Sequence, residues 1–164
     1  MKREQLALTD RPCGACGVGR FQPTDVKGRA FAYRDERALV LTTSLLVPVC
    51  NVCGELRERG AHAESLDTLL EAEYTTKRIA ATKELVATLL DDGWRQVEIE
   101  QVMALSAGYL SKALRGEKTL ATSTLRHLIH LALHPRQTLQ DLTPRFPQVR
   151  EIELALERRG VFAA

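Results

Sequence analysis

The chain has 164 residues and a mass of 18.3 kDa, with 45% hydrophobic and 27% charged residues. This composition predicts one or two packed cores and excludes a fibrous or broadly disordered chain. No apolar stretch approaches the roughly 20 residues that span a membrane, and the charged residues Lys2, Arg3 and Glu4 offer no apolar signal segment. We therefore expect a cytoplasmic protein without membrane contact.

The charge distribution is more informative than the net charge. A formal charge of +2 does not by itself indicate nucleic-acid binding. Residues 1–75 carry 10 basic and 11 acidic side chains, whereas residues 76–164 carry 13 basic and 10 acidic ones. A nucleic-acid-binding surface is therefore expected in the second half of the chain.

The four cysteines, Cys13, Cys16, Cys50 and Cys53, form two runs with the same pattern, CxxCG. Two intervening residues allow a tight turn that directs both sulfurs at one ion, and the following glycine can adopt a positive φ. Two disulfides or a redox-active CxxC are the alternatives, but there is no export signal, and a thioredoxin-like site needs only one such motif. Four thiolates complete a closed tetrahedral site, so we expect one structural Zn²⁺ per chain.

The segment between the two motifs reads as short strands at residues 29–34, 39–41 and 45–47, which predicts a zinc ribbon. From Ser65 the spacing of apolar residues becomes helical. Its phase slips near Thr75 and Thr76, which can cap a new helix, and a domain boundary is predicted there. The next helix is expected to stop at residues 91–93, and Trp94 is expected to fill the following core.

Residues 95–116 are interpreted as two short helices joined by a turn, the pattern of a helix-turn-helix. Ser106 is predicted to cap a second helix that runs from Ala107 to Leu114. The residues expected to face the core are Ile99, Val102, Met103, Leu110, Ala113 and Leu114. The fold class expected for the whole chain is α+β and mainly α, with a small zinc ribbon followed by an all-helical domain.

The outer face of that second helix combines small, aromatic and basic residues, which suits a major groove. The alternative is an ordinary solvated face, with the tyrosine packed on the helix surface. The residues predicted to contact DNA on this face are Ala107, Gly108, Tyr109, Ser111, Lys112, Arg115 and Lys118.

Residues 10–135 resemble the MqsA-type antitoxins. The resemblance rests on the two CxxCG motifs about thirty-five residues apart, a helical link, the pattern from Gln96 to Gly116, and the helix opening at Thr122. It implies a toxin-binding zinc domain at residues 1–75 and an Xre-like helix-turn-helix domain at residues 76–135. It also implies a homodimer that represses its own operon at a palindromic operator, and a small, typically RNA-cleaving toxin as partner.

Individual positions of the motif follow or depart from that family. Gln96 stands where the family has a glutamine that touches phosphate, and this role is carried over. Glu100 replaces a small residue, commonly alanine, and Ala104 replaces the glycine of the turn. The family's base-reading asparagine and arginine correspond here to Gly108 and Lys112, so the resemblance does not supply the operator sequence.

Residues 136–164 form a C-terminal helical extension of unassigned role, in which Val149, Ile152 and Leu156 make an apolar stripe. The stripe is expected either to pack on its own domain or to lie at a dimer interface. No catalytic constellation or phosphate loop stands in a recognisable context, so no enzyme activity is expected. Two alternatives to an antitoxin stay open, namely a stand-alone zinc-containing regulator and a protein-interaction adaptor that does not bind DNA.

Overall fold

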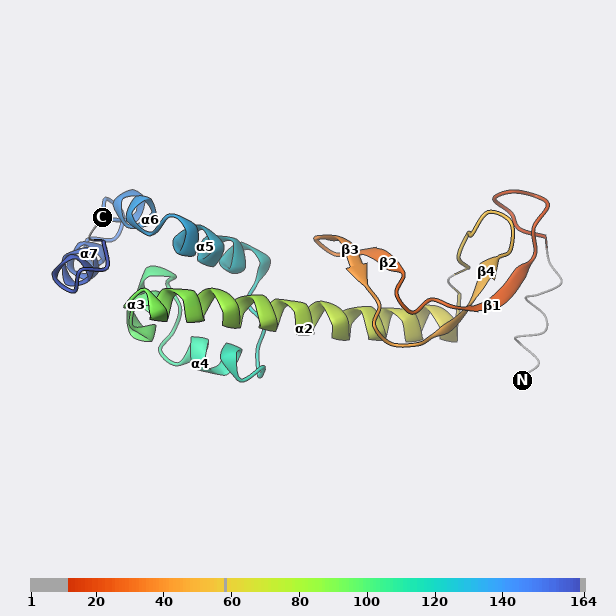
Figure 1. The fold of residues 1–164 in the computed structure, drawn as a ribbon, viewed down its shortest axis with the longest axis horizontal. Coiled ribbons are helices and arrows are strands. Elements are labelled where there is room, and N and C mark those ends of the chain that lie inside the picture. Colours follow the sequence, from red (N-terminus) through yellow and green to blue (C-terminus); the bar gives the residue numbers. More distant parts are fainter. Residues whose placement is uncertain (1–11, 58, 163–164) are drawn as a thin grey trace. The chain divides into compact units, whose positions relative to one another are not determined.

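The computed structural model describes residues 12–57 and 59–162, so the charged residues 2–4 lie outside the described range. Short antiparallel strands come first and helices follow (Figure 1), which confirms the α+β fold class with a mainly helical second part. The chain divides into two compact units, Met1–Tyr74 and Thr75–Ala164. Each unit has its own buried apolar core.

Two separate two-stranded sheets make up the strand part of the first unit. Strand β1 (Phe21–Asp25) pairs antiparallel with β4 (Leu46–Cys50), and β2 (Ala30–Tyr33) pairs antiparallel with β3 (Glu36–Val40). The three expected strands are thus present, while β1 was not predicted. Its sequence buries only Phe21 and contains Pro23, so it lacks the alternating apolar pattern that identifies a strand.

The core of the first unit lies between these strands and the first half of helix α2 (Ala61–Asp91). The helix contributes Leu66, Leu70 and Tyr74 at four-residue steps, which places them on one face. The buried residues from the strand region are Val26, Leu39, Leu41, Val47 and Val49.

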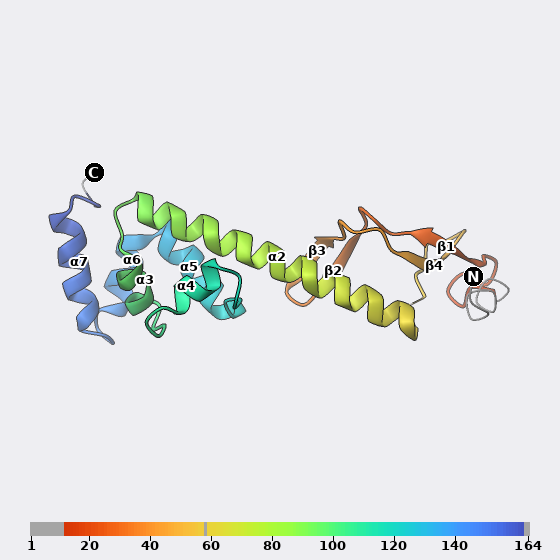
Figure 2. The same cartoon turned by 90° about the horizontal axis from the view of Figure 1, so that it is seen from below.

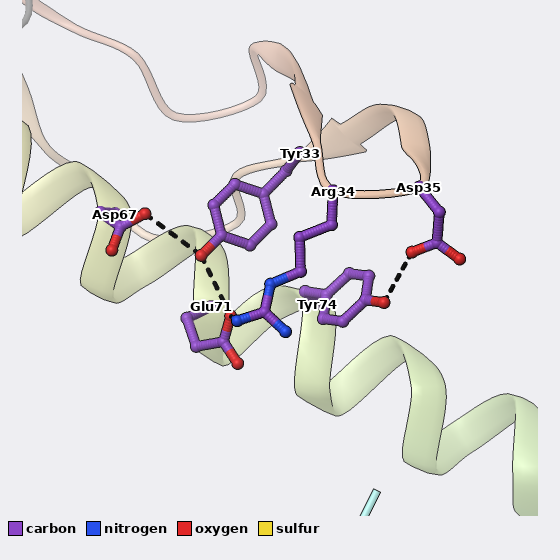
Figure 3. Close-up of polar contacts among 6 residues, drawn as sticks. All are labelled: Tyr33, Arg34, Asp35, Asp67, Glu71 and Tyr74. Carbon is purple, nitrogen blue, oxygen red and sulfur yellow. Dashed lines mark hydrogen bonds and ion pairs between the residues drawn. The ribbon is translucent and has the colours of Figure 1, made fainter. Parts of the chain in front are cut away.

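A polar cluster joins the turn between β2 and β3 to α2 (Figure 3). The Tyr33 hydroxyl donates to carboxylate oxygens of Asp67 and Glu71, at 3.2 and 3.0 Å. Arg34, which has a φ of 52°, forms an ion pair with Glu71 at 2.7 Å, and its guanidinium lies over the ring of Tyr74. These contacts fix the tip of the hairpin on the helix.

Helix α2 is continuous across Thr75 and Thr76, so the predicted helix break there is wrong. Both views draw it as one uninterrupted helix (Figures 1 and 2). The buried positions continue at four-residue steps through Arg78, Thr82 and Val86. Because two of these positions are polar, the apolar pattern is interrupted although the helix is not.

In its described residues, 75–162, the second unit contains helices and no strand. Its helices after α2 are α3 (Gln96–Val102), α4 (Tyr109–Leu114), α5 (Thr122–Leu133), α6 (Pro135–Leu142) and α7 (Gln148–Arg158). Gly93, with a φ of 91°, follows the end of α2 as predicted, and Trp94 is buried in the core with 3% of its surface exposed. The predicted helix start at Thr122 is also confirmed.

The C-terminal stripe belongs to the same core. Val149, Ile152 and Leu156 are buried among the residues of the second unit. A nearby ion pair, 2.7 Å between Arg159 Nη2 and a carboxylate oxygen of Glu98, joins the end of α7 to α3. Of the two locations considered for this stripe, the structure supports packing on its own domain.

Candidate metal centre and helix-turn-helix surface

The two CxxCG motifs fold into the same turn. Gly17 and Gly54 each have a φ of 72°, the left-handed conformation predicted for them. Their N–H groups donate to the carbonyl oxygens of Cys13 and Cys50, at 2.8 and 3.0 Å. The backbone therefore presents two equivalent pairs of cysteines.

The four predicted cysteines converge, with all Sγ atoms within 4.8 Å of one another. The Sγ atoms of Cys13 and Cys53 are 3.7 Å apart, as are those of Cys16 and Cys50. A disulfide requires about 2.05 Å, whereas thiolates on a tetrahedral ion with bonds of about 2.3 Å lie about 3.8 Å apart. The spacing therefore fits a shared metal ion, and the cluster can hold one.

Backbone amides favour the thiolate form of two of these ligands. The N–H of Gly19 donates to Cys16 Sγ at 3.3 Å, and this bond lowers the pKa of Cys16. The N–H groups of Cys53 and Val52 lower the pKa of Cys50 to about 6. Because the thiolate is the metal-binding form, these amides prepare the site for an ion.

Gly19 belongs to the metal centre although it lies outside both CxxCG motifs. A Cβ added at Gly19 would lie 2.3 Å from Cys50 Sγ and 3.0 Å from Val52 Cβ. At Gly14, inside the first motif, an added Cβ would meet nothing within 4 Å. The absence of a side chain at residue 19 thus lets the two motifs approach each other. Its position three residues after Cys16 was the available sequence signal.

The helix-turn-helix is present, but its second helix begins later than predicted. Helix α4 starts at Tyr109, and its N-cap is Gly108, which has a φ of 74°. Because glycine has no side chain, the N-cap residue itself supplies no capping hydrogen bond. The assignment of Ser106 as the cap and of Ala107 as the first helical residue is therefore wrong. Ala104 has a φ of 52°, so it adopts the left-handed conformation although it is not glycine.

The capping role is taken instead by Glu100, which is buried on α3 with 4% of its surface exposed. Its two carboxylate oxygens accept the N–H groups of Gly108, at 3.1 Å, and of Leu110, at 2.9 Å. The side-chain amide of Gln96 donates to Glu100 at 3.1 Å and to the Ser111 hydroxyl oxygen at 2.7 Å. Gln96 therefore links the two helices.

The predicted basic residues lie on or just after α4. Lys112 and Arg115 are exposed, and Arg115 forms an ion pair with Glu117 at 2.5 Å, which lowers the pKa of Glu117. Tyr109 is half-buried against the core, and Lys118 Nζ lies 5.4 Å from the centre of its ring. Among the remaining predicted residues, Ala107 is exposed and Gly108 is half-buried.

Comparison with protein families, with curated proteins and with solved structures finds no match to this chain. Within residues 12–57 and 59–162, no helix is both long enough and apolar enough to cross a membrane.

Proposed function

We propose that the protein is an antitoxin-like transcription repressor. Its second unit binds operator DNA as a homodimer, and its first unit holds one structural zinc ion and binds a small toxin. The observation that supports DNA binding is the anchored helix-turn-helix, whose second helix carries the exposed Lys112 and is followed at its C-cap by the exposed Arg115. Repression would follow from blocking a promoter.

The reading of DNA would depend on α4 entering the major groove. The exposed Ala107 allows close approach of the backbone, while Ser111 and Lys112 are of the types that bond to base edges. Arg115 and Lys118 would bind phosphates and set the register. A symmetric dimer places two such helices about 34 Å apart, so the operator would be an inverted repeat.

Zinc is the metal proposed for the cysteine cluster. Four thiolates in tetrahedral spacing select zinc or iron, and a site closed by four protein ligands is typical of structural zinc. Metal-bound thiolates persist in a reducing compartment, which supports a location in the cytoplasm. The site has four protein donors and no catalytic role is assigned to it.

The toxin-binding part rests on the resemblance and on charge. Four acidic side chains lie around the hairpin and the first half of α2, with Arg34 among them in an ion pair with Glu71: Asp35, Asp67, Glu71 and Glu73 (Figure 3 shows the first three and Arg34). Such a surface complements the small basic protein expected as toxin. Neutralisation would consist of covering the toxin's active or substrate-binding surface, with no chemistry by this chain.

DNA binding is tested with the duplex upstream of the protein's own gene. The double variant Lys112→Ala with Arg115→Ala is expected to weaken binding at least tenfold, because both phosphate and base contacts are removed. Arg158→Ala, which removes an exposed cation on α7, serves as the matched control and is expected to bind like the wild type. Unchanged binding by the double variant would contradict the assigned surface.

Toxin binding is tested by co-expression with the product of the adjacent reading frame. A stable complex with the full chain is expected, and charge reversal at Asp67 is expected to weaken it. If the adjacent product is not a toxin and forms no complex, the stand-alone regulator is the better assignment.

A further inference from the structure

Glu100 is a buried carboxylate at the centre of the helix-turn-helix, at a position where Xre-like domains usually have a small residue. We propose that Glu100 is the positioning residue of the DNA-reading surface: it fixes the start of α4 and, through Gln96, makes the Ser111 hydroxyl a hydrogen-bond donor toward DNA. This inference rests on the proposed function, because it assigns how the same surface is oriented.

The first step concerns the start of α4. A helix begins with N–H groups that have no partner within the helix, and a helix of only six residues is not stable by itself. Gly108 has no capping side chain, and the carboxylate of Glu100 accepts the N–H groups of Gly108 and Leu110 instead. The orientation of α4 is thereby tied to α3.

The second step concerns the direction of the hydrogen bonds. Both carboxylate oxygens of Glu100 accept backbone N–H groups, and Gln96 turns its NH₂ group toward the same carboxylate. The second N–H of this group then donates to Ser111 Oγ. Because that oxygen already accepts a bond, the hydroxyl hydrogen of Ser111 is left to donate.

The third step concerns what Ser111 recognises. Ser111 lies on α4, is half-buried and is followed by the exposed Lys112, so it lies at the edge of the surface that would face DNA. A donor at this point suits the acceptors of the major groove, which are guanine O6 and N7, adenine N7 and thymine O4. The exocyclic amino groups of adenine and cytosine are donors, so they are less suitable partners.

The test uses the full-length, metal-loaded protein and the duplex upstream of its own gene. In Glu100→Gln, which preserves the size of the side chain, one carboxylate oxygen becomes an NH₂ group, so at least one of the three bonds is lost. Glu98→Gln is the matched control, because Glu98 is a second buried acid on α3 that bonds to Arg95 and Arg159 and has no bond to α4. Circular dichroism establishes that each variant is folded at the assay temperature.

We expect Glu100→Gln to weaken duplex binding at least tenfold and Glu98→Gln to change it less than twofold. Ser111→Ala is also expected to weaken binding. The double variant should lose less affinity than the sum of the two single losses, because part of the effect of Glu100 passes through Ser111. Wild-type affinity in folded Glu100→Gln, or strictly additive losses in the double variant, would overturn the proposal.

A failure of the proposed function is separable from a failure of this inference. If the wild type does not bind the duplex, DNA binding is refuted, and the positioning role is then judged by amide hydrogen exchange. Faster exchange at Gly108 and Leu110 in Glu100→Gln than in Glu98→Gln supports the role of the carboxylate. Equal exchange in the two variants overturns it.

Discussion

Gly19→Ala is the substitution most sensitive to the geometry of the metal centre. An added Cβ would lie 2.3 Å from Cys50 Sγ, whereas ordinary contact begins near 3.4 Å. The sulfur would have to retreat by about 1 Å, several times the ~0.2 Å tolerance of a metal–ligand bond. The substitution is therefore expected to detach Cys50 from the ion.

The size of the effect follows from the binding free energy. Structural zinc sites bind with about 10–16 kcal/mol. If four ligands contribute equally, loss of one removes roughly 3 kcal/mol, which corresponds to about a hundredfold in affinity. Since so small a sheet region buries little apolar surface, the first unit should unfold at a lower temperature as well.

The assay is competition for zinc between the full-length protein and a chelator, with thermal unfolding measured on the same samples. Gly14→Ala is the matched control, because its Cβ meets nothing within 4 Å and its φ is not positive. It should bind zinc like the wild type and be as stable or up to about 1 kcal/mol more stable. Wild-type zinc affinity in Gly19→Ala would refute the reasoning.

Three further tests concern the backbone strain, packing and electrostatics of the two units. Ala104→Gly should stabilise the second unit by about 0.5–1 kcal/mol in urea unfolding, because its φ of 52° strains alanine more than glycine; a loss of stability would contradict this. Leu156→Ala, at a position with 0% exposure, should lower the free energy of unfolding by about 2–5 kcal/mol. Its control Leu154→Ala, at a position with 41% exposure, should lower it by less than about 0.5 kcal/mol. Equal losses of stability in the two variants would argue against packing of α7 in the core. The Thr42 hydroxyl and N–H donate to Glu73 and lower the pKa of its carboxyl group. The stability from these bonds is therefore fully present above the pKa of Glu73 in the unfolded chain, about 4.3, and is lost as the pH falls through its lower pKa in the folded protein. Glu73→Gln should flatten this acid-range dependence in unfolding of the first unit, and an unchanged pH profile would exclude the assigned role.

Features that depend on neighbouring residues in the sequence were predicted well. The two cysteine turns, the end of α2 before Gly93, the burial of Trp94 and the start of α5 at Thr122 all follow from short motifs. In each case a few adjacent residues decide the local backbone or the local burial. At these positions the local sequence is sufficient to predict the backbone conformation or the burial.

The continuity of α2 could not be read from the apolar pattern. Just after the predicted break, two buried positions of α2 are occupied by the polar residues Arg78 and Thr82. Arg78 donates to the Leu120 carbonyl oxygen at 2.7 Å, and the Thr82 hydroxyl donates to the carbonyl oxygen of Arg78 at 2.8 Å. These bonds satisfy polar groups at core positions, so an interruption in hydrophobicity did not mean an interruption in the helix.

The start of α4 was missed for a related reason. Ser106 has the residue type of a good cap, but the carboxylate that bonds to the helix start comes from Glu100, on the preceding helix. The capping rule considers only residues adjacent to a helix start, whereas here a tertiary contact overrides it. The same contact gives Glu100 a physical role, which is to anchor the start of α4.

The central claim is that the second unit binds operator DNA through its basic α4 surface. It is tested most directly by titrating the zinc-loaded protein with the duplex upstream of its gene over a range of salt concentrations. With Arg115 and Lys118 neutralising phosphates from each of two protomers, the logarithm of the affinity should fall with the logarithm of salt with a slope of about −4. An affinity that does not change with salt, or no binding by protein that contains its metal, would contradict the account.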